Sequence, residues 1–248
     1  MYQNYIFDLY GTLVDIHTDE NDLIVWEKLA LFYGYYGAFY QPQELKDSYF
    51  RLVGQEKEGK QLSLHSQPNY NHEANPEIQI ERVFEKLFTE KGKKAKNGLA
   101  IYAGQFFRVL TTEYICLYQG VTTMLKKLKE KGKNIYLLSN AQRIFTEYEL
   151  VMLGIIRYFN GIMISSDYGI KKPELRFFEL LLEKYNLDKN ESIMIGNDGT
   201  CDIDGGKRAG MDTYYIHSNL SPKDIEKVDA TYIQMEMDME KFCHVLKI

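Results

Sequence analysis

The sequence predicts an α/β fold of the doubly wound, Rossmann-like kind, a parallel sheet core interrupted by an inserted helical domain. A short apolar run, Tyr5–Phe7, stops at a carboxylate and a glycine, as a buried strand does at the edge of a sheet. Residues 17–112 then have helical character, and from Gly120 onward strand and helix signals alternate. Short apolar strands separated by helices are typical of a parallel sheet covered on both faces.

The composition excludes several classes of protein. The 248 residues are 45% hydrophobic and 26% charged, which suits one large core or a core with a smaller appended domain. A net charge of -5 argues against nucleic acid as a partner, and no apolar stretch is long enough to span a membrane. Three scattered cysteines are too few for a disulfide framework or a zinc cluster. The first residues lack the features of a signal peptide, so we expect a cytoplasmic protein.

The inserted region is predicted to be helical because its apolar residues recur at helical spacing. The clearest case is 78–88, where Ile80, Val83, Phe84, Leu87 and Phe88 fall on one face. Further helices are expected over about 22–40, 44–53 and 99–110. Polar segments around 55–77 and 91–98 are expected to separate them. The aromatic cluster at 32–40 is predicted to pack these helices against one another.

The second half of the chain gives alternating elements. A helix beginning near Val121 is predicted to end at Lys131-Gly132, and another helix is expected to follow Pro173 as a first-turn residue. Apolar spacing at 144–152 predicts a further helix. A short helix is also expected at 204–209. The strands are expected at 134–139, 161–165, 192–196, 212–216 and about 231–235.

Residues just after each strand are the candidates for chemistry, because ligands of an open parallel sheet bind beyond the carboxyl ends of its strands. These positions hold Asp8 and Thr12, then Ser139 and Asn140, then Lys172, and finally Asn197, Asp198 and Asp202. A carboxylate can attack phosphorus, and Mg²⁺ held by Asp8 with the Asp198/Asp202 cluster can offset the charge. Lys172 can neutralise Asp8 and a bound phosphate. Ser139 is predicted at a strand-to-helix turn whose free N–H groups would seat an anion.

Four segments carry this pattern: Asp8–Asp15, Ile135–Asn140, Gly169–Pro173 and Ile195–Met211. In that order they resemble the four motifs of the haloacid dehalogenase-like (HAD) hydrolase superfamily. The resemblance implies a core of residues 1–16 and 113–248 with a helical cap of residues 17–112. It implies that Asp8 is the nucleophile and that Thr12 fixes the first motif loop. Ser139, Asn140 and Lys172 would bind substrate, and the backbone carbonyl of Tyr10 would join Asp8, Asp198 and Asp202 around the metal.

Two positions depart from the family pattern. Tyr10 stands where phosphatases of the family carry a second aspartate, which acts as general acid and base, and a phenol with a pKa of about 10 replaces it poorly. Asn197 stands in the first acidic place of the fourth motif. With a tyrosine at position 10, the first motif resembles that of the haloacid dehalogenases of the family, which need no metal. Phe178 in place of their tyrosine argues against that chemistry, and Arg51, the only arginine between Asp8 and the polar stretch near Gln55, is no clear counterpart of their cap arginine.

The sequence therefore favours a Mg²⁺-dependent phosphatase of small phosphorylated metabolites that works through an aspartyl-phosphate at Asp8. One alternative is a 2-haloacid dehalogenase-type hydrolase with an aspartyl ester at the same residue. Another is a weakly catalytic family member that binds a ligand or a protein. A small-molecule substrate is expected in the first two cases, and neither nucleic acid nor a membrane is expected as a partner. The oligomeric state is not predicted.

Overall fold

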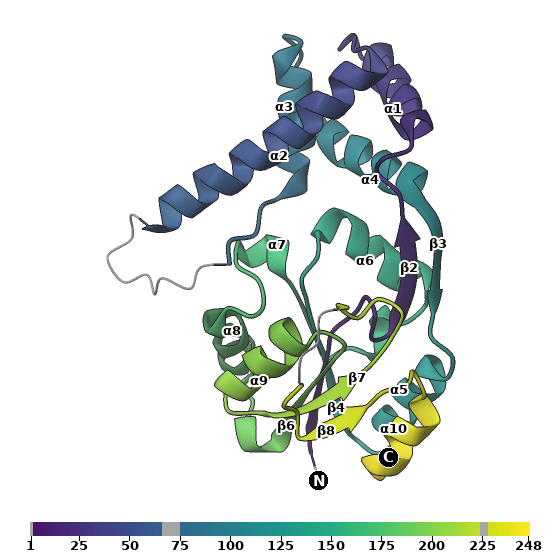
Figure 1. The fold of residues 1–248 in the computed structure, drawn as a ribbon, viewed down its shortest axis with the longest axis vertical. Helices are drawn as coiled ribbons and strands as arrows, with labels where there is room; N and C mark the ends of the chain where they lie inside the picture. Colours follow the sequence, from purple (N-terminus) through teal and green to yellow (C-terminus); the bar gives the residue numbers. More distant parts are fainter. Residues whose placement is uncertain (1, 66–74, 224–227) are drawn as a thin grey trace.

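The computed structural model describes residues 2–65, 75–223 and 228–248. Its main sheet has six parallel strands in the order β5-β4-β1-β6-β7-β8, with the first strand of the chain near the middle (Figure 1). The strands are β1(Asn4–Phe7), β4(Asn134–Ser139), β5(Gly161–Ile164), β6(Ser192–Gly196), β7(Asp212–Ile216) and β8(Tyr232–Gln234). The predicted doubly wound α/β fold is thus confirmed.

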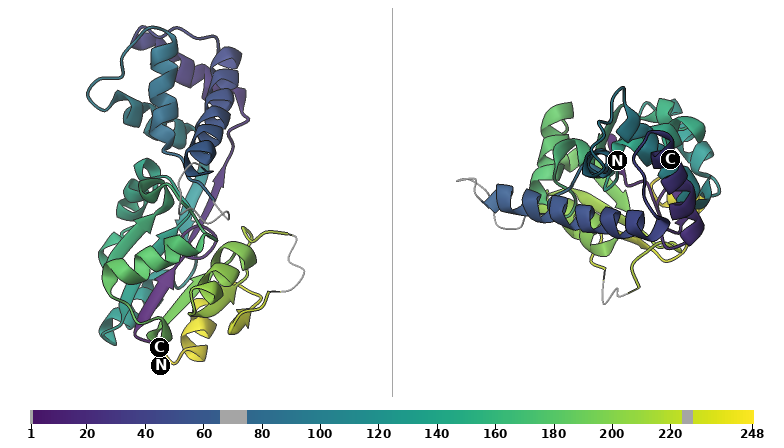
Figure 2. Two further views of the ribbon diagram at one scale, coloured as in Figure 1. Left: turned by 90° about the vertical axis from the view of Figure 1, so that its left-hand side faces the viewer. Right: turned by 90° about the horizontal axis from the view of Figure 1, so that it is seen from above.

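Helices cover both faces of this sheet because alternate residues of each strand point to opposite sides. Tyr5 and Phe7 pack on one side against α5 and α10, whereas Ile6 packs on the other side against α8. Figures 1 and 2 show these two helical layers on either side of the sheet. The helical segments of this part are α5(Val121–Glu130), α6(Arg143–Met152), η1(Ile156–Tyr158), α7(Ser165–Tyr168), α8(Leu175–Tyr185), η2(Lys189–Glu191), the π-helical η3(Gly199–Asp204), α9(Gly205–Arg208) and α10(Met239–Val245).

A second hydrophobic core lies in the helices that precede α5. We call α1(Leu23–Tyr35), α2(Pro42–His65), α3(Ile80–Glu90) and α4(Leu99–Thr111) the helical insert. Trp26, Tyr33, Phe84 and Phe107 are buried in its core, and Figure 1 shows the insert stacked on the carboxyl-end side of the sheet. The aromatic cluster at 32–40 contributes Tyr33, whose ring centroid lies 4.3 Å from that of Phe88.

An antiparallel ribbon joins the insert to the sheet domain, and the sequence did not predict it. The ribbon pairs β2(Val14–Thr18) with β3(Thr112–Leu117), so the expected boundary at 16/17 and 112/113 falls within its strands. Each of the two strands is short and far from the other in the sequence. Their pairing depends on the insert closing on itself, which local periodicity cannot report.

Two predicted boundaries were wrong. The segment from 55 to 65 continues α2 instead of forming a polar loop, because Glu, Lys and Gln are good helix formers and a largely exposed helix needs no apolar face. Residues 66–74 of that predicted loop lie outside the described residues. Helix α8 begins at Leu175 with Glu174 as its N-cap, and Pro173 lies before it in a cis peptide with Lys172 instead of starting its first turn.

Candidate active site

The carboxyl ends of the strands enclose a cavity of about 180 Å³. Most of the residues predicted from the strand ends line it, and three lining residues were not predicted: Cys201, Leu220 and Pro222. Leu220 and Pro222 follow β7, so the strand-end rule could have found them had it been applied to that strand as well. The predicted lining residues are Asp8, Tyr10, Asn140, Lys172, Asn197, Asp198 and Asp202.

Lys172 lies at the centre of the site, between two carboxylates. Its Nζ donates to Asp8 Oδ1 at 2.7 Å and to Asp202 Oδ1 at 2.6 Å, and its side chain is 1% exposed. Burial alone would lower the pKa of Lys172, but the charges of Asp202 and Asp8 outweigh it and raise that pKa. Burial raises the pKa of Asp202 to about 7, with Lys172 opposing and Asp8 reinforcing the change. The three groups form one compensated charge cluster.

The backbone around Lys172 is held from two sides. Asn140 accepts from the Lys172 N–H at 2.8 Å and donates to the Lys172 carbonyl at 2.9 Å. On the other side, the segment that leads into α3 runs along the third motif: Lys171 donates to the Asn75 carbonyl at 3.0 Å, and Glu77 donates to the Gly169 carbonyl at 3.0 Å. Asn140 therefore positions the lysine through its main chain.

The first motif loop is fixed by a hydroxyl and a glycine. Thr12 Oγ1 lies 3.4 Å from Asp8 Oδ2 and 3.3 Å from Asn197 Oδ1, and so joins the first motif to the fourth. Gly11 has a φ of 85°, and a Cβ there would lie 2.3 Å from the Asn197 amide nitrogen. Only glycine tolerates both the backbone angle and this approach.

Ser139 is buried next to the site, at the end of β4. Its Oγ is without a hydrogen-bond partner among residues 2–65, 75–223 and 228–248, although the side chain is 1% exposed. The helix start predicted directly after Ser139 lies further along the chain, because α6 begins only at Arg143 with Gln142 as its N-cap. A buried hydroxyl without a partner is costly, so Ser139 is available to a ligand oxygen.

Tyr10 directs its hydroxyl away from Asp8, toward α6. The hydroxyl donates to Glu149 Oε2 and lies 3.1 Å from Thr146 Oγ1. Burial and the neighbouring Glu149 charge raise the pKa of Tyr10 above its ordinary value, against the opposing charge of Arg108. A phenol in this state keeps its proton and does not serve as a base near neutral pH.

The predicted metal ligands are oxygen donors of the type that Mg²⁺ prefers, but most are already engaged. Asp198 Oδ1 accepts from the N–H groups of Thr200 and Cys201 at the start of η3, and Asp202 is paired with Lys172. In the described part of the chain no group of three or more His, Cys, Asp or Glu side chains is arranged to hold a metal ion. The Thr12 hydroxyl lies within hydrogen-bond distance of one oxygen from Asp8 and one from Asn197.

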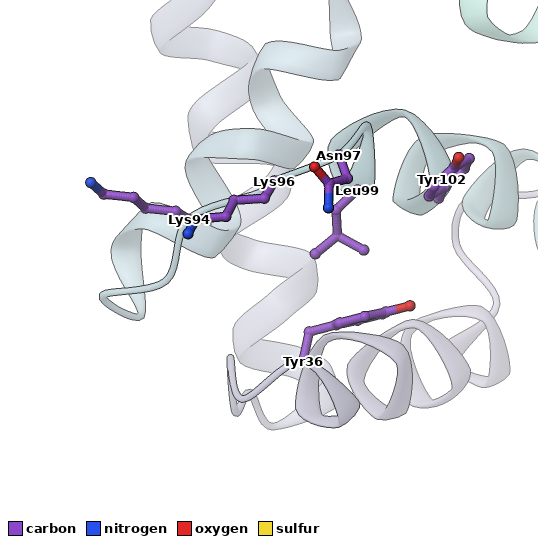
Figure 3. Close-up of a pocket in the computed structure, with 6 residues that line it drawn as sticks. All are labelled: Tyr36, Lys94, Lys96, Asn97, Leu99 and Tyr102. Atoms are coloured by element: carbon purple, nitrogen blue, oxygen red, sulfur yellow. The ribbon is translucent and has the colours of Figure 1, made fainter.

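A second cavity, of about 330 Å³, lies within the helical insert (Figure 3). The side chain of Leu99, from the start of α4, points toward the ring of Tyr36, which follows α1. Lys94, Lys96, Asn97 and Tyr102 complete the lining, and the two lysines are exposed. None of the predicted site residues lines this cavity, so we do not assign the chemistry to it.

The fold and the site define an α/β protein with a carboxylate–lysine–carboxylate centre at the carboxyl ends of its sheet. The chain belongs to the haloacid dehalogenase-like hydrolases, whose sequence model matches residues 2–210. This finding confirms the resemblance drawn from the four motifs. In the described residues no helix is both long and apolar enough to cross a membrane.

The relatives of this chain have different named activities. A glyceraldehyde 3-phosphate phosphatase of Methanothermobacter thermautotrophicus is 31% identical over 112 residues, which are 45% of this chain and 50% of that protein. The chain thus matches about half the length of this curated relative. A 2-haloacid dehalogenase of Pseudomonas syringae superposes with a TM-score of 0.65 at 18% identity, covering 100% of this chain and 99% of that one. YfnB of Bacillus subtilis, bound to magnesium, superposes at 0.54 with 21% identity and coverages of 100% and 99%. At these identities the superpositions show a shared fold alone.

Proposed function

We propose that this protein is a Mg²⁺-dependent phosphatase of small phosphorylated metabolites, with Asp8 as the nucleophile. The observation that carries the proposal is the contact of Lys172 Nζ with both Asp8 Oδ1 and Asp202 Oδ1 in a buried cluster at the strand ends. An ammonium group in that place orients the attacking carboxylate and compensates the charge of an incoming phosphate. A phosphatase relative in the same family adds support.

Two displacements account for the reaction. A carboxylate oxygen of Asp8 forms a bond to phosphorus while the bond to the ester oxygen breaks, and the leaving oxygen takes a proton from solvent. Water then attacks the aspartyl-phosphate, which releases inorganic phosphate and restores Asp8. Ser139, whose hydroxyl has no partner in the described part of the chain, and Lys172 would hold the phosphate oxygens, and Asn140 would keep Lys172 in place. Thr12 would fix the loop.

Magnesium would bind where oxygen donors from the first and fourth motifs meet. Asp8, the backbone carbonyl of Tyr10 and Asp202 remain the proposed ligands, together with Asp198 or Asn197, and all five residues line the cavity. When bound, the ion would offset the negative charge that builds up on the phosphate. Asn197 is neutral, whereas the family pattern has an acidic residue at this position of the fourth motif. We therefore expect a weaker magnesium site than a set made only of carboxylates would provide.

We further propose that the helical insert acts as a cap over the cavity, with residues 17–112 as the cap and 1–16 and 113–248 as the core. A cap that closes over the strand ends would exclude water and select the substrate. The three cysteines, Cys116, Cys201 and Cys243, all lie in described ranges and are free. Free thiols suit a reducing cytoplasm, the compartment that we propose.

A screen of phosphorylated metabolites, with and without Mg²⁺, tests the phosphatase. We expect phosphate release that depends on the metal and is abolished in the Asp8→Asn variant. The matched control is Asp212→Asn, which changes an exposed carboxylate at the amino end of β7 and should leave release unchanged. Absence of phosphate release from every substrate by the unaltered protein would refute the phosphatase.

A dehalogenase is the second candidate, and the state of Tyr10 favours it. Its hydroxyl is bound to Glu149, so the position where phosphatases place an acid–base carboxylate offers no such group to a leaving oxygen. A halide leaves without a proton. Halide release from a 2-haloacid in the presence of a metal chelator would support this candidate, whereas ligand binding with turnover insensitive to Asp8→Asn would instead indicate a weakly catalytic binding protein.

A further inference from the structure

A chain of polar contacts joins the helical insert to the first motif loop. Arg108, in α4 of the insert, pairs with Glu149 in α6, and Glu149 accepts the hydroxyl of Tyr10. We propose that Arg108, Glu149 and Tyr10 form a latch that holds the insert over the cavity, and that Tyr10 is a positioning residue of this latch. The latch itself is inferred from geometry alone. Its effect on kinetics rests on the proposed function.

The contacts are specific and shielded. Arg108 Nε donates to Glu149 Oε1 at 2.7 Å, and its Nη2 lies 3.4 Å from Oε2, the oxygen that also accepts from Tyr10. The Arg108 guanidinium carbon lies 5.7 Å from the centre of the Tyr10 ring and 5.3 Å from that of Phe145. The Glu149 side chain is 9% exposed. A charge-assisted, two-pronged contact of this kind at a shielded position is much stronger than a surface ion pair.

Packing around the latch brings α4 and α6 close together. Gly104, one turn before Arg108, has no side chain, and a Cβ there would lie 2.6 Å from Ile144 Cδ1 of α6. Gln105 Nε2 donates to the Ile144 carbonyl at 3.2 Å, and Ile144 belongs to the hydrophobic core of the insert. The insert therefore has a contact with α6 that is independent of the β2–β3 ribbon.

The latch reaches the nucleophile through the main chain. Tyr10 lines the cavity and lies two residues after Asp8, so a movement of Glu149 or Arg108 is passed to the loop that carries the carboxylate. Opening the insert requires Arg108 to leave both Glu149 and the face of the Tyr10 ring. Substrate entry and the order of the nucleophile loop are thereby coupled.

Three substitutions break the latch at different points while keeping most of the volume: Tyr10→Phe, Glu149→Gln and Arg108→Met. Hydrogen exchange of the intact protein measures the latch without any substrate. We expect the amides of β2, β3 and α6 to exchange about tenfold faster in each variant, the effect of losing one hydrogen bond to a charged group. The strands β1 and β6 should exchange at unchanged rates. The control is Arg51→Met, which breaks an Arg–Glu pair of the same length, 2.7 Å, within the insert itself.

Kinetics then separate positioning from direct catalysis. For a phosphate ester that the unaltered protein hydrolyses, we expect Tyr10→Phe to raise KM about tenfold and to lower kcat by less than a factor of about three. The double variant Tyr10→Phe/Arg108→Met should exchange no faster than the faster single variant, because both remove one coupled unit. Arg108→Lys keeps the positive charge, so its amides should exchange more slowly than those of Arg108→Met.

Three results would overturn the latch. The first is unchanged hydrogen exchange in all three variants. The second is a kcat loss in Tyr10→Phe larger than about a hundredfold with KM unaltered, which would make Tyr10 a catalytic acid. Faster exchange in the Arg51→Met control, equal to that of the latch variants, would also overturn it. If the unaltered protein hydrolyses no phosphate ester, the proposed function fails while the exchange result still decides the latch.

Discussion

Replacing Lys172 by methionine tests the charge cluster at the centre of the site. The methionine would fill a similar volume without a charge and would leave Asp8 and Asp202 facing each other. Both carboxylates contact the same nitrogen, at 2.7 and 2.6 Å, so they lie no farther apart than the sum of these distances. Removing the common partner of two shielded carboxylates leaves a buried charge without compensation, which costs about 3–5 kcal/mol.

The expected loss can be measured by urea unfolding and by thermal unfolding in metal-free buffer. For a chain of this size, a loss of that order lowers Tm by roughly 10 °C. The control is Lys241→Met, because Lys241 Nζ contacts Glu236 at 2.6 Å but both side chains are exposed. Screening by solvent makes such a pair weak, so the control should unfold as the unaltered protein does.

The loss should also depend on pH. Burial raises the pKa of Asp202 to about 7 even with Lys172 present, and removing the ammonium group raises it further. A carboxyl whose folded pKa is raised loses stability as pH rises through that pKa. The difference in unfolding free energy between variant and unaltered protein should therefore widen between pH 7 and pH 9. A variant as stable as the unaltered protein across this range would refute the argument that Lys172 compensates the two carboxylates.

Three further substitutions test the surroundings of Lys172. Ser139→Ala removes a buried hydroxyl that has no hydrogen-bond partner among the described residues, so we expect the ligand-free protein to gain about 1 kcal/mol in unfolding free energy and inorganic phosphate to inhibit about tenfold more weakly. In Gly196→Ala the new Cβ would lie 2.2 Å from Asp202 Oδ2, and overpacking should lower the unfolding free energy by about 1–3 kcal/mol in urea titrations. Asn140→Ala removes both contacts to the Lys172 main chain, so kcat should fall about tenfold in steady-state assays with little change in KM.

Each of these outcomes can fail separately. Unchanged phosphate inhibition in Ser139→Ala would mean that this hydroxyl does not contact the ligand. Full stability of Gly196→Ala would show that Asp202 can move away without cost. An unaltered kcat in Asn140→Ala would assign the placement of Lys172 to the segment at Asn75 and Glu77 instead.

Much of the fold follows from local patterns. The apolar runs at 134–139 and 192–196 coincide with β4 and β6, because a strand buried on both faces needs a continuous apolar stretch. The helix predicted at 78–88 is present as α3, shifted by two residues, since the spacing of its apolar face is fixed by helix geometry. The extension of α2 to His65 was missed because an exposed helix carries no such spacing.

The sequence placed most of the strand-end residues in one cavity but did not show the contacts between them. The strand-end rule brought Asp8, Lys172 and Asp202 to one cavity, since parallel strands end at the same edge of a sheet. It did not identify Arg108 or Glu149, which lie in the last turns of α4 and α6 and belong to no motif that the sequence showed. Nor did it show that Asp198 caps η3 or that the hydroxyl of Tyr10 points to α6.

The succession of strands along the chain, the residue types at their ends and the place of the helical insert were determined by the sequence, because periodicity and turn chemistry act over a few neighbouring residues. Pairings between distant segments were decided only in three dimensions: the β2–β3 ribbon, the Lys172 cluster and the contact from Arg108 through Glu149 to Tyr10. Their energy depends on burial and on distances of a few ångströms. Such quantities exist only once the chain has folded.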